Sequence, residues 1–208
     1  MFRFILDRWQ KPSGFREDIR EEQERPTWEI ILGEASRHAV LYASPVHGVM
    51  HWRGVAATGL DLCGLSPVSD PDIVLAFAIV HDCCRVDERD DPEHGTRAAH
   101  FVERSATLLN MLGEERTSVL STACRFHNKG TTTSCPTVGA CWDADRYNLL
   151  RLDRKPGSHL LSLRISPEDR ERTLNSARHY VRQPPDWPAI LQKHRDILSE
   201  RQLTHPAH

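Results

Sequence analysis

The most constraining feature of the sequence is an uninterrupted apolar run, Ile73–Val80, that leads directly into His81 and Asp82. A helix that is apolar on every side has no face for solvent, so this run is expected to lie inside the core. The chain therefore brings an imidazole and a carboxylate to the end of a buried helix. A buried carboxylate costs several kcal/mol unless it is paired or bound to a cation. The alternative is that both side chains emerge into solvent where the helix ends.

Helix signals recur along the whole chain, and no segment has the pattern of a strand ladder. Most expected helices begin where a capping residue precedes a proline, and all keep helical apolar spacing. They run from Ser44 to about Gly64, Asp70 to Cys84, Asp91 to about Leu112, Glu114 to His127, Val138 to Leu152 and Ser166 to about Arg182, with a last helix that contains Ile190 and Leu198. The charged residues 16–25 are also helix-prone. The predicted fold is an all-α bundle of five core helices with additional N- and C-terminal helices.

Length and charge limit the organisation and the partners. The 208 residues are about the length of one domain, so a single domain over residues 1–208 is expected. The formal net charge of -2 provides no general attraction to nucleic acid or to an anionic membrane. The chain has no apolar run of about 18 residues or more and no signal-peptide pattern, which indicates a cytoplasmic protein.

The cysteines are not typical of a disulfide framework or a zinc finger. Frameworks are dense in short secreted domains, whereas this chain has six cysteines in 208 residues. No C-x-x-C pair occurs, so the usual spacing of zinc ligands is missing. The thiols are expected to be reduced and to pack as small apolar groups.

Histidine is the unusual residue type, with 12 in the chain. Besides the His81–Asp82 pair, four positions place a ligand-type side chain on the apolar face of an expected helix, namely His51, His94, His127 and Asp145. One such residue is by default a satisfied core side chain. Five helices that each present one inward are typical of metal sites in helical bundles. Asp143 and Asp145 are about 200° apart around a helix, so only one of them can face such a site.

The order of these residues resembles the HD superfamily of metal-dependent phosphohydrolases. That pattern is a His, an adjacent His-Asp pair, optional further histidines and a late Asp. The strings HWRGV at 51–55, DPEHG at 91–95 followed by Ala98-Ala99, and DADRYNLLR at 143–151 are similar to the corresponding family helices. The resemblance covers about residues 44–155, with helical extensions over 1–43 and 156–208. The family's Ala-Asp-Arg string selects Asp145 as the late ligand, and Asp143 remains the alternative.

The resemblance implies a site that holds one or two divalent metal ions. Its ligands would be His51, His81, Asp82, His94, His127 and Asp145. Asp82 would bridge the two ions, and His94 and His127 would be ligands of the second ion. Imidazole and carboxylate ligands suit Mn, Mg, Fe, Zn, Ni or Co, so the ligand types do not identify the metal. The implied reaction is hydrolysis of a phosphomonoester, phosphodiester or nucleotide by a metal-activated water.

Two basic residues are candidates for binding the substrate. Arg85 stands three residues after Asp82, where relatives often carry lysine in His-Asp-x-x-Lys, and it is expected to clamp the phosphoryl group as a catalytic residue. The alternative for Arg85 is an ion pair with Asp87, Glu88 or Asp90. Lys129, in a loop with Gly130, is the second candidate. The expected substrate is small, phosphorylated and nucleotide-like.

Two other functions compete with hydrolysis. A minority of proteins that resemble this family hold a di-iron pair in the same six-ligand set and act as oxygenases. The other competitor is a non-catalytic module that binds a nucleotide in a regulatory role. No membrane partner is expected, and the chain has no basic stripe with interleaved aromatics that would favour nucleic acid. A homo-oligomer is compatible with the sequence.

Overall fold

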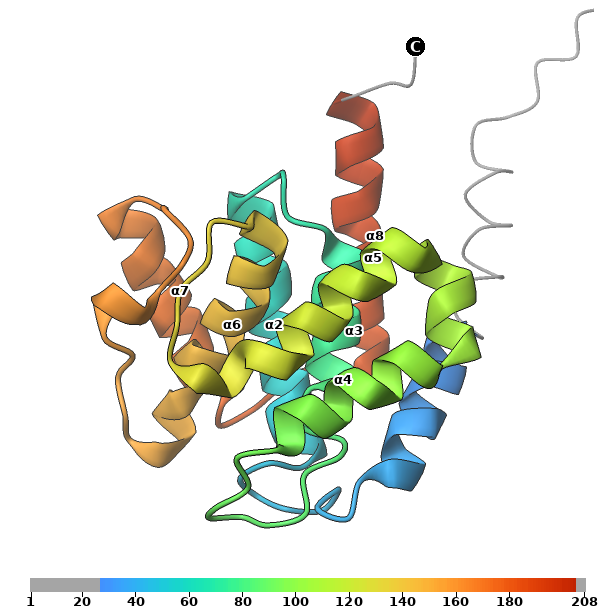
Figure 1. Cartoon of the computed structure of the whole chain (residues 1–208). Coiled ribbons are helices and arrows are strands. Elements are labelled where there is room, and N and C mark those ends of the chain that lie inside the picture. The colour runs from blue at the N-terminus through green and yellow to red at the C-terminus, as the bar shows by residue number, and fades with distance from the viewer. Residues whose placement is uncertain (1–26, 205–208) are drawn as a thin grey trace, which may run out of the picture.

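The computed structural model describes residues 27–204, and this part of the chain forms helices and no strand. The predicted all-α fold is therefore confirmed. After a helical segment over 27–38, the helices are α2 (Val49–Leu65), α3 (Pro71–Val80), α4 (His94–Arg104), α5 (Ala106–Phe126), α6 (Pro136–Tyr147), α7 (Pro167–Tyr180) and α8 (Trp187–Thr204) (Figure 1). Three short 3-10 turns, η1 (His127–Lys129), η2 (Asn148–Leu152) and η3 (Ser158–Leu160), join them. The predicted helix around residues 16–25 lies outside the described residues.

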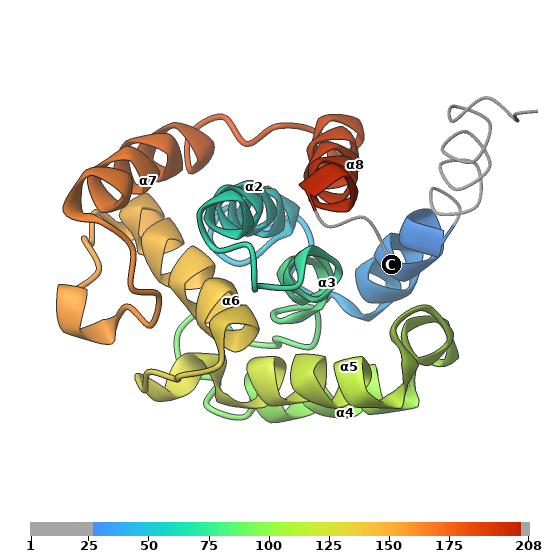
Figure 2. The ribbon, with the colours of Figure 1, turned by 90° about the horizontal axis from the view of Figure 1, so that it is seen from above.

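Two helices form the centre of the bundle. Figure 2 shows α2 and α3 surrounded by α4, α5, α6, α7, α8 and the segment 27–38. This position explains the apolar run, because every residue of α3 except Asp72 is buried. The two central helices also approach closely, since a Cβ at Gly59 would lie 2.6 Å from Cγ1 of Val74. The centre of the fold is thus a closely packed pair with no solvent face on α3.

The capping signals place several helix starts correctly. Asp70 accepts hydrogen bonds from the backbone N–H groups of Asp72 and Ile73 at 3.0 and 3.2 Å, so α3 begins at Pro71 as predicted. Ser166 caps α7 in the same way, through the N–H of Asp169. The predicted end of α3 at Cys84 is wrong, because the helix stops at Val80 and turns follow it.

Two predicted starts are wrong, because the serine or aspartate is used for another contact. Ser44 accepts from the N–H groups of Val46 and His47 in a turn, and α2 begins only at Val49. Asp91 does not cap α4, which begins at His94. Its carboxylate instead accepts from the N–H of Val86 at 2.8 Å and pairs with Arg97.

The predicted helix from Asp91 to Leu112 is also divided. Ser105 has an extended backbone and caps α5 by accepting from the N–H of Leu108 at 3.2 Å, so residues 106–112 belong to the next helix. The expected break between Leu112 and Glu114 is a kink inside α5, where Gly113 has a φ of 75°. Only glycine enters this left-handed region without strain.

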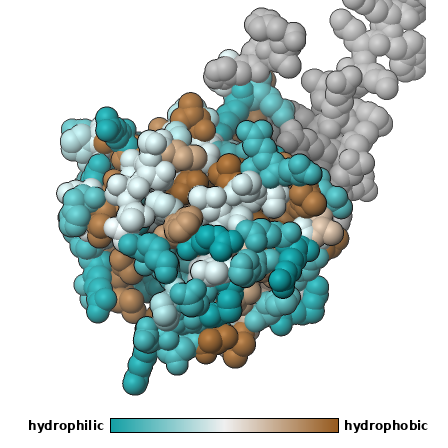
Figure 3. All heavy atoms as spheres, viewed as in Figure 1, coloured by the Kyte–Doolittle hydropathy of each residue, from teal (hydrophilic) through white to brown (hydrophobic). Residues whose placement is uncertain are grey.

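The outer surface is mostly polar. On the face in Figure 3 hydrophilic residues predominate and apolar residues form separate small groups. The six cysteines are free. In the described part of the chain, no helix combines the length and the apolar character needed to span a membrane.

Candidate metal centre

Six ligand-type side chains lie together inside the bundle, at the ends or inner faces of five segments. They are His51 in α2, His81 and Asp82 directly after α3, His94 at the start of α4, His127 directly after α5 and Asp145 in α6. All are buried except Asp145, whose side chain is 19% exposed. The cluster is therefore closest to solvent at the Asp145 side chain.

The six residues divide into two groups of three, each with one carboxylate. The first group is His51, His81 and Asp145. Nε2 of His51 lies 3.2 Å from Nε2 of His81 and 3.3 Å from Oδ1 of Asp145. The atoms of this group that face one another are thus two imidazole nitrogens and one carboxylate oxygen.

The second group is Asp82, His94 and His127, with Nε2 of His94 and Nε2 of His127 2.9 Å apart. Oδ1 of Asp82 is 3.4 Å from the first of these nitrogens and 3.7 Å from the second. Its other oxygen, Oδ2, faces the first group, at 3.6 Å from Nε2 of His51 and 3.5 Å from Nε2 of His81. One carboxylate thus lies between the two groups.

Backbone carbonyls orient three of the four imidazoles. Nδ1 of His127 is 2.7 Å from the carbonyl of Cys124, and Nδ1 of His81 is 3.2 Å from the carbonyls of Phe77 and Ala78. Nδ1 of His94 makes the same contact with the carbonyl of Asp91. Because a carbonyl only accepts, Nδ1 of His81 and Nδ1 of His127 each carry a proton, and when these rings are neutral each points an Nε2 lone pair into the cluster.

Nε2 of His94 has a protein donor within reach, Nη1 of Arg85 at 3.3 Å, but other atoms of the cluster do not. Oδ1 of Asp82 and Nδ1 of His51 are buried and have no hydrogen-bond partner. A buried carboxylate without a donor is costly, and a cation among the oxygens and nitrogens would relieve that cost. The donor set therefore fits a divalent metal ion, with imidazole and carboxylate ligands and no thiolate.

Burial keeps most of the imidazoles neutral. It lowers the pKa of His51 to about 3, with a further contribution from the charge of Arg151, and it lowers the pKa of His94 to about 4. The pKa of His81 is also lowered, mainly by burial. These three rings are therefore unprotonated at neutral pH and free to act as ligands.

The pKa values of the two carboxylates and of His127 are set by the neighbouring charges more than by burial. Burial alone would raise the pKa of Asp82, but the surrounding histidines, His81 first, hold it well below its usual range. The pKa of Asp145 is lowered in the same way, with His51 the main cause against burial. Burial would lower the pKa of His127, but the nearby carboxylates of Asp82 and Asp145 outweigh it and raise this pKa. A proton on His127 therefore competes with a cation at a higher pH than a proton on any of the other three rings does.

This difference predicts two pH dependences for metal binding. Below the pKa of His127, binding of Mn²⁺ to the second group should release about one proton. The affinity for Mn²⁺ should then fall by up to about tenfold for each unit by which the pH is lowered. Binding to the first group should change less over the same pH range, because the pKa of His51 is about 3 and that of His81 is also lowered. Titration calorimetry at pH 6 and pH 8, in buffers with different ionisation enthalpies, measures the protons released.

A His127→Gln variant provides the control for this titration. It should lose the proton release together with one class of Mn²⁺ sites, and it should keep the other class. Equal proton release by this variant and by the natural protein would contradict the assignment.

The structure separates the two candidate aspartates of α6. Asp145 faces His51, whereas the Asp143 carboxylate accepts hydrogen bonds from the backbone N–H groups of Ser162 and Leu163, the shortest at 2.7 Å. Asp143 therefore anchors the segment after η3 and does not contact the six-residue cluster.

The two basic candidates lie in different surroundings. Arg85 is buried, and its Nη1 lies 3.1 and 3.3 Å from the two ring nitrogens of His94. Its Nε donates to the backbone carbonyl of Asp87 at 2.9 Å, and in the described residues no carboxylate lies within ion-pair distance of it. Lys129 is exposed and donates to the carbonyl of Pro92 at 3.3 Å. Arg85 thus borders the cluster, and Lys129 lies on the outside.

Sequence reasoning missed one cation beside the cluster. Arg151 in η2 donates from Nε to the carbonyl of Val46 at 2.7 Å and from Nη1 to that of Asn148 at 2.8 Å. Its charge acts on His51, and those of Asp145 and Asp82 act on it. The described residues offer it no carboxylate within ion-pair distance. In the sequence, Arg151 was indicated only by its position at the end of the 143–151 string.

Comparisons of the chain with protein-family models, with curated proteins and with solved structures found no match.

Proposed function

We propose that this protein is a metal-dependent phosphohydrolase of the HD type, with one or two divalent ions held by the six-residue cluster. The observation that carries the proposal is the position of Asp82, whose two carboxylate oxygens face two separate groups of ligand-type side chains. A carboxylate in this position is suited to bridge two cations. The resemblance of the ordered residues to the HD pattern supports the same assignment.

The cations beside the cluster support an anionic substrate. Arg85 borders His94, and Arg151 lies near the group that contains His51. Both guanidinium groups donate to backbone carbonyls, and no carboxylate of the described residues lies within ion-pair distance of them. A guanidinium binds phosphate through two parallel hydrogen bonds. Substrate would approach where Asp145 is partly exposed and place its phosphoryl oxygens between these side chains.

In the proposed reaction, a bound divalent ion supplies Lewis-acid polarisation of the phosphoryl group and lowers the pKa of a water molecule. The protein keeps His51, His81 and His94 neutral, so that their Nε2 atoms are available as ligands. The Arg85 guanidinium would stabilise the charge that develops on the phosphoryl oxygens. Cytoplasmic nucleotides and other small phosphoesters are the substrates that this arrangement suits best.

The test is metal analysis followed by an activity screen. Protein purified without added metal is analysed for Mn, Fe, Co, Ni, Zn and Mg, and is then assayed for release of phosphate from nucleotides, monoesters and diesters. Hydrolysis should require the ion, and Arg85→Lys should lower kcat/KM by about 10- to 1,000-fold while leaving the bound metal unchanged. Lys129→Ala is the control and should change kcat/KM by less than about twofold, because its ammonium is exposed.

Two outcomes would replace the proposal. Coloured protein that contains iron and consumes dioxygen without releasing phosphate would favour the oxygenase. Protein that binds a nucleotide without turnover, and whose Asp82 variant loses thermal stability alone, would favour the non-catalytic module.

A further inference from the structure

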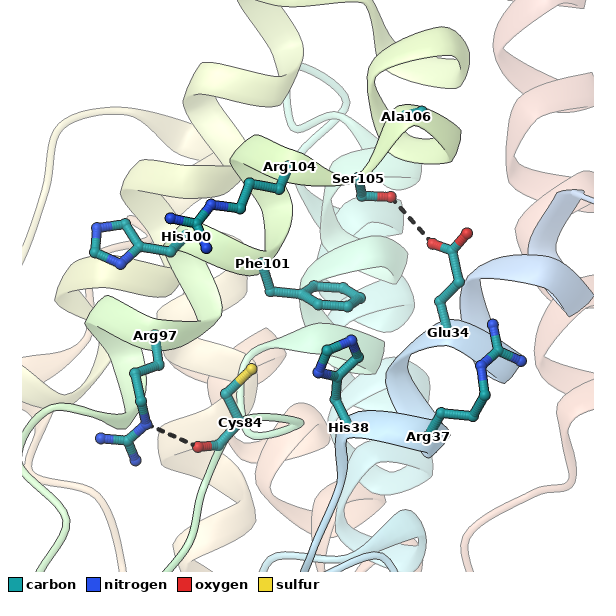
Figure 4. A pocket seen from close by; sticks show the side chains of 10 residues that line it. All are labelled: Glu34, Arg37, His38, Cys84, Arg97, His100, Phe101, Arg104, Ser105 and Ala106. Carbon is teal, nitrogen blue, oxygen red and sulfur yellow. Dashed lines mark hydrogen bonds between the residues drawn. The ribbon is translucent and has the colours of Figure 1, made fainter.

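A cavity of about 470 Å³ lies between the helical segment 27–38 and α4, on the outside of α4. Its lining is Glu34, Arg37, His38, Cys84, Arg97, His100, Phe101, Arg104, Ser105 and Ala106 (Figure 4). None of the six residues of the candidate metal centre lines it. The volume is in the range of about 300 to 1,000 Å³ that is typical of small-molecule sites.

The cavity is positively charged. Three of the lining residues are arginines, and among the described residues Glu34 is the one carboxylate that lines the cavity. That carboxylate is already used, because it accepts hydrogen bonds from Ser105 at 3.1 Å and from Thr107 at 2.7 Å. An anion in the cavity would therefore meet little opposing charge.

Two of the arginines are free to bind such an anion. Arg97 is occupied, since it pairs with Asp91 and donates to the carbonyl of Cys84. Arg37 and Arg104 are exposed, and among the described residues neither has a carboxylate within ion-pair distance. Arg97, His100 and Arg104 are spaced by three and four residues, so they form one stripe along α4. Figure 4 shows these three side chains on one side of the Phe101 ring.

The middle of the cavity is aromatic. The rings of Phe101 and His38 lie in an edge-to-face arrangement, with their centroids 5.0 Å apart and an interplanar angle of 72°. Both rings are drawn at the centre of Figure 4, between Arg104 on one side and Arg37 on the other. An aromatic ring beside unpaired guanidinium groups is suited to stack a planar base while the cations bind a phosphate.

We propose that this cavity is a second ligand site, which binds a nucleoside monophosphate with its base against Phe101 and His38 and its phosphate at Arg104 and His100. The site is separate from the candidate metal centre and does not depend on the function proposed for that centre. The two are linked through α4, which begins with His94 and carries the stripe of the cavity on its outer side.

Titration calorimetry of the full chain with AMP, GMP, CMP and UMP tests the site. At least one nucleotide should bind, and Arg104→Gln and Phe101→Leu should each weaken its binding by at least tenfold. Arg172→Gln on α7 is the matched control, because this arginine is 71% exposed and distant in the fold, and it should bind as the natural protein does. Circular dichroism checks that Phe101→Leu keeps the helical fold, and the exposed Arg104→Gln tests the proposal without a change in the core.

Other results would overturn the proposal. One is that none of the four nucleotides binds. Another is that inorganic phosphate binds as tightly as the nucleotide, which would remove the role of the two rings. A third is that Arg104→Gln and Phe101→Leu bind normally while Asp82→Asn abolishes binding, which would assign the nucleotide to the metal centre alone.

Discussion

Replacement of Asp82 by alanine is expected to remove the bound metal and the activity together. Among the described residues, Asp82 is the carboxylate whose oxygens face both groups of histidines, so its loss removes one member of the second group and the oxygen that faces His51 and His81. The affinity for Mn²⁺ should fall by at least about 100-fold, and kcat should fall in proportion to the metal lost. Metal analysis after gel filtration and phosphate release by the same samples measure both effects.

Asp143→Asn is the matched control for this variant. Asp143 is a buried aspartate in the same bundle, but it accepts hydrogen bonds from the backbone N–H groups of Ser162 and Leu163. Its replacement should lower the free energy of unfolding by about 1–3 kcal/mol and leave the metal content unchanged. Loss of metal from Asp143→Asn, or full metal content in Asp82→Ala, would refute the assigned ligands.

Replacement of Gly95 by valine is expected to damage the fold and the second ligand group at once. A Cβ at Gly95 would lie 2.7 Å from the carbonyl oxygen of Cys124 and 3.3 Å from Cε1 of His127. Because backbone atoms cannot give way easily, α4 would move away from the end of α5. The free energy of unfolding should fall by about 1–3 kcal/mol, and binding of the second Mn²⁺ should weaken more than that of the first.

Gly64→Ala separates the effect of close packing from that of a glycine in a helix. A Cβ at this position of α2 meets nothing within 4 Å, so the substitution should raise stability by up to about 1 kcal/mol through helix propensity. Chemical denaturation and calorimetric titration of both variants give the two measurements. Equal Mn²⁺ binding by Gly95→Val and the natural protein would show that His94 and His127 do not act as a group.

Local chemistry was enough to predict the fold class and the position of the buried helix. The apolar run up to Val80 requires a place with no solvent face, and the structure gives α3 that place. The proline signals worked at Asp70 and Ser166, whose side-chain oxygens accept from the first backbone N–H groups of their helices, although Asp70 also accepts from Arg116. The same signal failed at Asp91, whose carboxylate is taken by Val86 and Arg97, contacts that no local pattern indicates.

The juxtaposition of the six ligand-type residues could be predicted because each lies on or beside the inner face of a helix. Whether they bind metal stays a prediction. Arg151 could not be found in the same way, since its position depends on carbonyl groups of Val46 and Asn148 that the chain brings together only in three dimensions. The break at Ser105 was also missed, because the apolar spacing continues across it.

The candidate ligands lie in two layers of the bundle, so a bound cation would affect how easily the outer helices separate from the central pair. His51, His81 and Asp82 belong to the central pair of helices, whereas His94 and His127 belong to the outer pair. A shared cation would therefore act as a removable cross-link between layers, tightening α4 and α5 onto the centre when loaded and releasing them when chelated. Cellular metal supply would then set the lifetime of the native chain as well as its turnover.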